Sequence, residues 1–586
     1  MVRRIQSHWR LVTVALLVSL VMLVTHAVFG TPAGSSYKHN LPWFEGFQDA
    51  FWQGVLYPRV LPELWFGMGG FDFYFYGPMP FWIASLLGPV VCPGCDTSQT
   101  FSVVGALMMI ASGATFFLFA RRFFDVPWAG IGALVFVLLP YHYLSDWFAR
   151  QAVGEVAAFI FLPLLALASV KLIEEKKGGI LFAFSFAAIA LSHLPTTLIL
   201  VHVVAALVGW VALTRETDWS KRSVLVGRFA LWGGLGAALS AFYWWPALSL
   251  LPLASADNLY SAYFDATRWL FLDGQAEPSA KTALTSKWQL ALVIAAAIVS
   301  YFLFKRETKP QALRDWIFVP SVIAVFMMTI VSYPIWQFWI VNMVQFPSRF
   351  LIMTDLSIAL AAAFLAQHIA RVGYKKLSPA VQRGALACIA AFAMAAFSAV
   401  LQAQFAAERT FVVERNLDHF GPPEYVPQAL FEVNMKRFNQ TVSDETSDND
   451  RYAQFFVEME RGRGLGEAAM TSASPQSQIT PVDGRGFDIS VTLDAPTTVP
   501  VPVAAWPYWE ATARDGGSVA ISTHETLGLV QLDLPAGQSE IQLRLTQSPA
   551  ERVATLISTI SFLVLVIAMI VGRVGVFGRF KANSRK

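Results

Sequence analysis

The chain has few charged residues for its length. Only 14% of its 586 residues are charged, whereas 55% are hydrophobic, and the mean hydropathy is +0.50. A soluble protein of this length needs far more polar surface, so the composition excludes that class and predicts a polytopic membrane protein. The net charge of +3 is uninformative by itself, whereas the positions of the charged residues along the chain indicate the membrane topology.

Several functional motifs are also missing. No P-loop and no Rossmann glycine pattern follows a predicted strand, which argues against nucleotide-dependent chemistry. No convincing internal repeat is found, which makes a transporter or flippase the weaker hypothesis. We expect no nucleic-acid partner.

Cysteine is scarce, with Cys92, Cys95 and Cys388 as the whole set. The first two form "CPGC" in a predicted outer loop, where an oxidising compartment permits a small disulfide. A zinc or thioredoxin-like site is disfavoured, because no second Cys or His pair and no soluble βαβ context accompanies it. Cys388 is interpreted as a buried apolar side chain.

The positions of basic residues predict the topology. The chain starts with "MVRRIQSHWR" and continues with an apolar run that we interpret as an uncleaved first span. Basic clusters then recur after every second apolar run. Assigning them to the cytoplasm predicts about twelve spans, with both termini cytoplasmic. The predicted spans are 11–30, 99–120, 127–143, 153–172, 179–192, 196–213, 225–244, 288–304, 315–333, 350–369, 383–404 and 553–573.

The C-terminal part has a different pattern. Between 408 and 550 the sequence alternates apolar and polar residues between turn signals such as "RDGG" and "PAGQ". We therefore predict a mainly α membrane protein: a helical transmembrane domain over 1–407, an antiparallel β-sandwich in the outer compartment over 408–550, and a last span with a basic tail over 551–586. For Trp506, Tyr508 and Trp509, sandwich core is favoured over sugar contact.

The long first outer loop, 31–98, is rich in aromatic and polar residues. Phe44, Phe47 and Phe51 return at helical spacing, with Glu45 and Asp49 on the other side, which predicts an amphipathic interfacial helix ended by Gly54. The following stretch places Arg59, Glu63, Asp72 and Tyr76 among aromatics and glycines. That composition suits a cleft for a polar, ring-shaped or phosphorylated ligand.

The order of several motifs carries a family resemblance. They are "YPRV", "GMGGFDFYFYGPMPFW", "DWFARQAVGE", "ALSHLPTT", "FPSRFL", "PPEYVP" and "AWPYWEATARDGG". In this order the chain resembles the bacterial membrane proteins called 6-pyruvoyl-tetrahydropterin synthase-related, which are similar to GT-C glycosyltransferases. The resemblance implies a location in the inner membrane of a bacterial cell. The resemblance implies transfer of a sugar from a polyprenyl-phosphate donor to a glycan or lipid acceptor on the outer face. It further implies an acidic base in the first outer loop, in some members with a divalent metal such as Mg or Mn.

The sequence departs from the family where the acidic pair is expected. His39 and Asn40 occupy that position. A histidine serves as a base near neutral pH, and Glu45 or Asp49 lies one or two helical turns away. A noncatalytic assembly or scaffold protein of an envelope polysaccharide system therefore stays open as an alternative.

Each candidate has a structural alternative. Asn40 is either a sugar ligand or a helix N-cap, and Glu45 and Asp49 are either catalytic or on a solvated face. Arg59 and Glu63 either bind ligand or pair with each other. The catalytic candidates are His39, Glu45, Asp49, Asp146 and Glu155. The substrate-binding candidates are Asn40, Arg59, Glu63, Asp72, Tyr76, Arg150, His193 and Arg349.

The later outer segments supply the other candidates. Asp146 and Arg150 have i,i+4 spacing and are able to pair, whereas Glu155 begins an apolar span, where ionisable groups usually carry function. Arg349 is predicted either to clamp a lipid phosphate or to snorkel to headgroups. Asp355 pairs with Arg349 or lines the cavity. The predicted topology brings His39, His142 and His193 to one face, but three scattered histidines often meet by chance, so no metal ligands are assigned.

Overall fold

The structure is a computed structural model. It describes residues 36–216, 218–255, 265–271, 289, 291–298, 310–372, 425–439, 477–482, 484 and 486–583. The predicted spans 11–30 and 383–404 lie outside these residues, as does Cys388.

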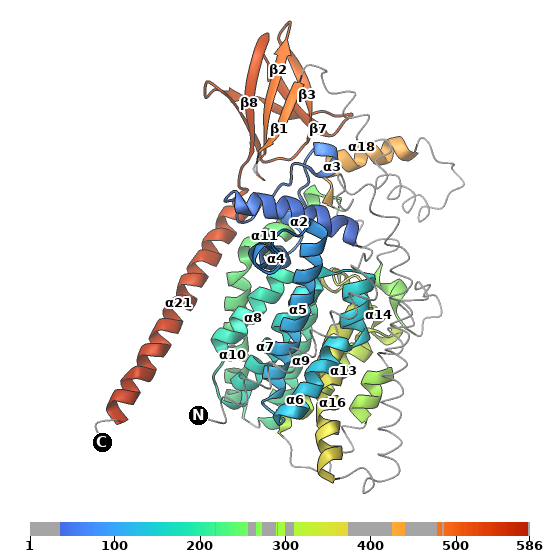
Figure 1. Ribbon diagram of the computed structural model, residues 1–586, viewed down its shortest axis with the longest axis vertical. Coiled ribbons are helices and arrows are strands. Elements are labelled where there is room, and N and C mark those ends of the chain that lie inside the picture. The colour runs from blue at the N-terminus through green and yellow to red at the C-terminus, as the bar shows by residue number, and fades with distance from the viewer. Residues whose placement is uncertain are drawn as a thin grey trace.

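Helices form a bundle with a β region at one end (Figure 1). Within the described residues, five helices are long and apolar enough to cross a membrane, or up to seven if each of two bent pairs is one span. The predicted count of about twelve stays a prediction. The five are α5 (Thr97–Ala120), α7 (Val153–Glu174), α9 (Leu194–Arg215), Pro347–Val372, which joins η8 (Pro347–Phe350) to α16 (Leu351–Val372), and the first part of α21 (Pro549–Asn583).

Two helix pairs are sharply bent. One joins α6 (Val126–Leu138) to the π-helix η2 (Tyr141–Ala149) at 50°, and the other joins α10 (Trp219–Leu239) to α11 (Ala241–Ser249) at 75°. The remaining described helices in the bundle are α8 (Gly179–Ser192), η3 (Leu251–Leu253), η6 (Ala266–Trp269), α13 (Gln311–Met327), η7 (Ile330–Ser332), α14 (Tyr333–Trp336) and α15 (Trp339–Asn342).

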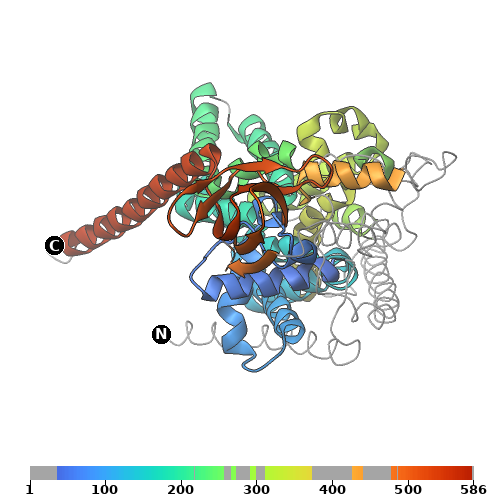
Figure 2. The same ribbon diagram turned by 90° about the horizontal axis from the view of Figure 1, so that it is seen from above.

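The described part of the segment predicted as the first outer loop folds into four helices: α2 (Tyr37–Trp52), α3 (Leu64–Gly67), η1 (Asp72–Tyr74) and α4 (Met79–Val91). Helix α2 lies across the top of the bundle (Figures 1 and 2). Phe44 and Phe47 on α2 are fully buried, whereas Glu45 and Asp49 are exposed, which confirms the predicted amphipathic pattern. Gly54 follows the helix with a left-handed φ of 93°.

The start of α2 corrects one alternative for Asn40. The helix begins at Tyr37 with Ser36 at the N-cap position, so Asn40 lies inside the first turns. It is not the N-cap that the sequence allowed.

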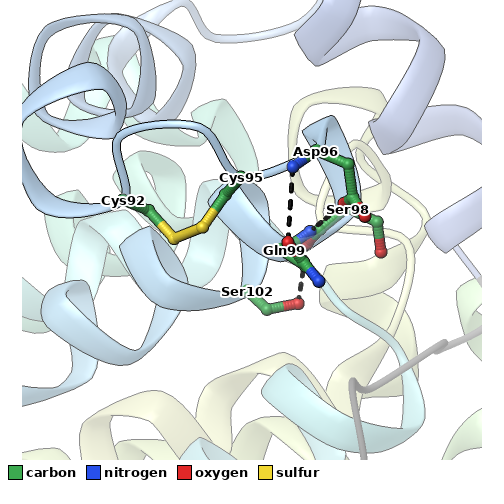
Figure 3. The surroundings of a disulfide bond; sticks show 6 residues. All are labelled: Cys92, Cys95, Asp96, Ser98, Gln99 and Ser102. Carbon is green, nitrogen blue, oxygen red and sulfur yellow. Dashed lines mark hydrogen bonds between the residues drawn. A yellow bond between two sulfur atoms is a disulfide. The ribbon is translucent and has the colours of Figure 1, made fainter.

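Cys92 and Cys95 form a disulfide in the loop between α4 and α5, as predicted (Figure 3). Helix α5 starts directly afterwards with a capping box. Asp96 accepts from the backbone N–H of Gln99 at 2.7 Å, and the Gln99 side chain accepts from the backbone N–H of Asp96 at 3.4 Å. The disulfide and the capping box therefore fix the short connection between α4 and α5 through contacts within the connection itself.

The C-terminal β region contains two antiparallel sheets. Their strand orders are β1-β2-β8-β4-β5 and β3-β7-β6. Inward-facing residues such as Phe487 and Leu532 are fully buried in one core, as the alternating pattern predicts. The strands are β1 (Ser477–Val482), β2 (Gly486–Leu493), β3 (Thr497–Ala504), β4 (Trp509–Ala513), β5 (Ser518–Val519), β6 (Ile521–Thr523), β7 (Leu529–Leu534) and β8 (Gly537–Leu545), with α18 (Gln428–Asn439) beside them.

The β region packs directly on the first outer loop. Trp506 stacks on Phe71 with ring centroids 4.5 Å apart and planes at 14°, and the backbone N–H of Ala504 donates to the Met68 carbonyl at 2.8 Å. Trp506 and Trp509 are almost fully buried. Their surroundings favour the core interpretation over sugar contact.

Arg59 ties the loop to the last helix. Its Nε lies 3.3 Å from Glu551 at the start of α21, and its Nη1 and Nη2 donate to the carbonyls of Phe73 and Phe242 at 3.0 and 2.8 Å. The predicted alternative of a pair with Glu63 is corrected, because Arg59 pairs with Glu551 and Glu63 is exposed. Since Glu551 is buried, Arg59 is the cation that offsets the cost of burying its carboxylate.

We predict that Arg59→Met destabilises the protein by about 3 kcal/mol, because it leaves the Glu551 carboxylate buried without its cation. Thermal unfolding in detergent is the measurement. Arg552→Met is the matched control, since Arg552 is exposed one residue after Glu551. Equal unfolding temperatures for the two variants would show that the ion pair contributes nothing.

Candidate functional site

Glu155 is the centre of a buried ionic cluster. It lies in the first turn of α7 and is 1% exposed. Its Oε1 accepts from Arg150 Nη2 at 2.9 Å and from Arg349 Nε at 3.1 Å, and its Oε2 accepts from the Tyr141 hydroxyl at 2.7 Å. Two arginines and a phenol offset the cost of burying the Glu155 charge. Glu155 in turn fixes the positions of the two arginine side chains.

Asp146 joins the cluster from η2. Arg150 Nη1 donates to its Oδ1 at 3.0 Å, which confirms the predicted i,i+4 pair. The side chain is completely buried, and its Oδ2 has no hydrogen-bond partner among the described residues. A buried carboxylate oxygen without a partner among the described residues is unusual, which makes Asp146 a candidate for ligand contact.

The π-helix η2 places these groups. Its Trp147 packs over α5 at Gly105, where an added Cβ would lie 1.6 Å from the indole ring. Single π-helical turns are rare and often occur at functional sites. The wider turn and this close approach bring Asp146 and Tyr141 to the Glu155 side of the bundle.

His193 lies at the break between α8 and α9. Its Nδ1 accepts from the backbone N–H of Thr196 at 3.3 Å, and its Nε2 lies 3.9 Å from Glu155 Oε1. Because Nδ1 acts as the acceptor in the helix cap, the neutral ring carries its proton on Nε2, which faces the cluster.

The first outer loop reaches the cluster through Tyr76. Its hydroxyl lies beside Gly154, where an added Cβ would be 3.4 Å away, and its ring packs on Trp43 with centroids 4.6 Å apart. Burial raises the pKa of Tyr76 to about 12, so the phenol keeps its proton at neutral pH. Asn40 Nδ2 also donates to the Gln151 carbonyl at 2.6 Å, which docks α2 next to Arg150.

The contacts of Asp355 contradict the predicted pair with Arg349. The Oδ1 of Asp355 instead accepts from Gln289 Nε2. The Gln289 side chain also accepts from the Tyr141 backbone N–H at 2.9 Å. Asp355 is completely buried, and it supports the start of η2 rather than the arginines.

The remaining candidates lie away from the cluster. Glu45 and Asp49 are on the exposed side of α2, and Glu63 is exposed directly before α3. Asp72 is buried beside Gly70 under the β region. The structure thus gathers Asp146, Arg150, Glu155, His193 and Arg349, with Tyr76 and Asn40 at their edge. Whether any of them acts on a substrate stays a prediction.

His39 lies on α2, with its ring 6.3 Å from Trp43. Its Nδ1 has no hydrogen-bond partner in the described part of the chain. Burial, and less strongly the charge of Lys38, lowers its pKa to about 3. The ring is neutral at pH 7, but it takes up a proton too weakly to be an effective base.

A divalent metal does not fit the cluster. Both arginines occupy Oε1 of Glu155, and Arg150 holds Asp146, so a metal ion would have to displace cations from both carboxylates. No group of three or more His, Cys, Asp or Glu residues suited to a metal ion occurs in the described segments.

Three residues that contact the buried charged side chains were not singled out from the sequence. Tyr141, Gln289 and Gln345 all make hydrogen bonds to the charged groups. The position of Tyr141 in a predicted outer turn was a usable signal. The two glutamines had none, because their contacts join segments far apart in the chain.

We predict that Gly154→Ala destabilises the protein by about 2 kcal/mol, because the new Cβ would lie 2.6 Å from the Ser192 carbonyl oxygen. Gly209→Ala in α9 is the control, since an added Cβ there meets nothing within 4 Å. Helix propensity alone should leave that control unchanged or slightly more stable. Chemical unfolding of both variants in detergent distinguishes them.

His39 gives a pH-dependent prediction. The unfolded chain binds a proton near pH 6.5, but the folded chain does not until about pH 3. The folded state therefore loses stability as the pH falls below 6.5. His39→Gln should make the free energy of unfolding less pH-dependent, by at most about 1.4 kcal/mol per pH unit. Unfolding at pH 7, 6 and 5 measures this, and identical slopes would refute it.

Comparisons with known proteins give structural likenesses only. No family model and no curated protein matches the chain, so the resemblance to the 6-pyruvoyl-tetrahydropterin synthase-related family stays a prediction. One similar structure is the oligosaccharyltransferase AglB from Archaeoglobus fulgidus, in complex with an inhibitory peptide and a dolichol-phosphate. It has 12% identity and a TM-score of 0.42, and the match covers 77% of this chain and 60% of that one.

Two other solved structures are similar. The arabinofuranosyltransferase AftD from Mycobacteria has 17% identity and a TM-score of 0.40, with 70% of this chain and 27% of that chain covered. ArnT from Cupriavidus metallidurans, bound to undecaprenyl phosphate, has 12% identity and a TM-score of 0.28, with 63% and 80% covered. This chain therefore spans 60% of the length of AglB and 27% of that of AftD. With all TM-scores below 0.5, these likenesses do not define its activity.

Proposed function

We propose that the chain is a GT-C-like membrane glycosyltransferase that moves a sugar from a polyprenyl-phosphate donor to a glycan or lipid acceptor. The observation that carries the proposal is the convergence of Asp146, Arg150, Glu155 and Arg349 in one buried cluster. Ionisable groups are costly at membrane depth and usually carry function. In this proposal the bundle has about twelve spans, the β region is a sandwich, and both cluster and β region face the periplasm of a bacterial cell, with cytoplasmic termini.

Arg349 is the better of the two predicted phosphate ligands. All three guanidinium nitrogens of Arg59 are engaged by Glu551 and two carbonyls. Arg349 uses Nε and Nη1 for Glu155, Val344 and Gln345, and its Nη2 has no hydrogen-bond acceptor among the described residues. A guanidinium with a spare N–H edge is suited to a phosphate oxygen.

Asp146 is the proposed proton acceptor. Its unpartnered Oδ2 takes the proton of the acceptor hydroxyl, while the acceptor oxygen bonds to the sugar C1 and the bond from C1 to the phosphate oxygen breaks. The leaving polyprenyl phosphate keeps the bonding electrons, and Arg349 stabilises its charge. Glu155 contributes by holding both arginines, and no metal enters this sequence of steps.

The alternative is a noncatalytic scaffold, and one observation favours it. His39 is a weak base, Asn40 is engaged with Gln151, and Glu45 and Asp49 face away from the buried side of α2. The first outer loop therefore presents no carboxylate to the cluster from this helix. This alternative predicts that His39→Ala and Glu45→Gln preserve cellular function, whereas deletion of the β region abolishes it.

The enzymatic proposal is tested with purified protein and a panel of undecaprenyl-phosphate sugars. We expect turnover of at least one donor, and a loss of about 100-fold or more in Asp146→Asn and Arg349→Lys. Arg552→Lys, at an exposed site on α21, should keep wild-type turnover. No turnover of any donor, or full activity in both cluster variants, would contradict the proposal.

A further inference from the structure

Two residues with strained backbone flank the arginines of the cluster. The described non-glycine residues with positive φ are Trp65, Gln151, Lys176 and Gln345. Gln151 directly follows Arg150, and Gln345 lies four residues before Arg349. Left-handed backbone costs energy for a residue with a side chain, and such strain is concentrated at functional sites.

Gln345 occupies a tight turn between α15 and η8. Its φ is 66°, its backbone N–H donates to the Asn342 carbonyl at 2.8 Å, and the Phe346 N–H donates to the Val344 carbonyl at 2.8 Å. The side chain is 8% exposed. Glycine would adopt this backbone without strain, so the choice of glutamine needs a reason in its side chain.

The side chain of Gln345 holds Arg349. Its Oε1 accepts from Arg349 Nη1 at 2.6 Å, and the Val344 carbonyl accepts from the same nitrogen at 2.8 Å. With Nε on Glu155, two of the three guanidinium nitrogens are fixed by protein acceptors. A planar guanidinium held at two nitrogens has a fixed third nitrogen.

We propose that Gln345 is a positioning residue that orients Arg349 toward the donor phosphate. Its left-handed turn brings two oxygens to Nη1, which leaves Nη2 as the nitrogen offered to a phosphate oxygen. The inference rests on the proposed function for the identity of the ligand. The geometry of the turn and of Nη1 does not depend on it.

Gln151 serves the other arginine in a different way. Its φ is 54° and it is completely buried. The carbonyls of Arg150 and Gln151 accept from the Ser36 N–H at 2.9 Å and from Asn40 Nδ2 at 2.6 Å. Nη1 and Nη2 of Arg150 are taken by Asp146 and Glu155. Both terminal nitrogens of Arg150 are therefore held by carboxylates, whereas Nη2 of Arg349 has no acceptor among the described residues.

The test compares binding of undecaprenyl phosphate by the purified full chain in detergent. In Gln345→Asn the backbone tolerates left-handed φ, but the side chain is too short to reach Nη1. We expect an unfolding temperature equal to or above wild type and binding weaker by about tenfold. Gln345→Glu keeps an acceptor for Nη1 and should bind within about threefold of wild type.

The control is Gln337→Asn, which changes an exposed glutamine of the same segment and should have no effect on binding. Wild-type affinity in Gln345→Asn would overturn the inference. An equal loss in Gln345→Asn and Gln345→Glu would overturn it too, because the acceptor oxygen would then be irrelevant.

A second measurement separates this inference from the proposed function. If wild type does not bind undecaprenyl phosphate, the donor proposal fails. Positioning is then judged by a double-mutant cycle of Gln345→Asn and Arg349→Lys in thermal unfolding. Non-additive effects would support the contact between the two side chains, and additive effects would overturn it.

Discussion

The structure depends on the burial of one carboxylate, that of Glu155. A single charge buried inside a protein is expensive unless oppositely charged groups surround it. Arg150 reaches Glu155 from the end of η2, and Arg349 reaches it from the start of the α16 span, so the charge can be buried only when these segments meet. The cost of leaving Glu155 without these cations favours the arrangement in which the end of η2, η8 and the start of α7 lie together.

The segment predicted as the first outer loop packs against the β region on one side and against the edge of the cluster on the other. Trp506 stacks on Phe71, and Tyr76 from the same loop lies beside Gly154 on α7. The first outer loop, the β strands and the top of α5 and α7 share one hydrophobic core. Helix α21 runs from this covered end to the opposite end of the bundle (Figure 1), and Glu551 at its start binds Arg59 of the loop. A shift of the loop therefore requires a shift of the β region.

Irregular backbone is concentrated where the charged groups meet. The π-helix η2 carries Asp146, the break between α8 and α9 carries His193, and left-handed glutamines flank both arginines. Regular helices would direct these side chains along fixed faces. Each irregularity changes the direction of a side chain at the end of a helix, and irregular backbone is tolerated there because it is buried in protein.

The sequence alone was sufficient for the features that depend on local periodicity and composition. It predicted the membrane class, the amphipathic α2, the alternating strands, the small disulfide and the pair of Asp146 with Arg150, because each involves residues close together in the chain. It did not predict the partners of Glu155, Arg59 or Asp355, which lie far away in sequence. Only the tertiary structure decided those pairings, because a buried charge takes its partner from whichever segment the folded chain brings beside it.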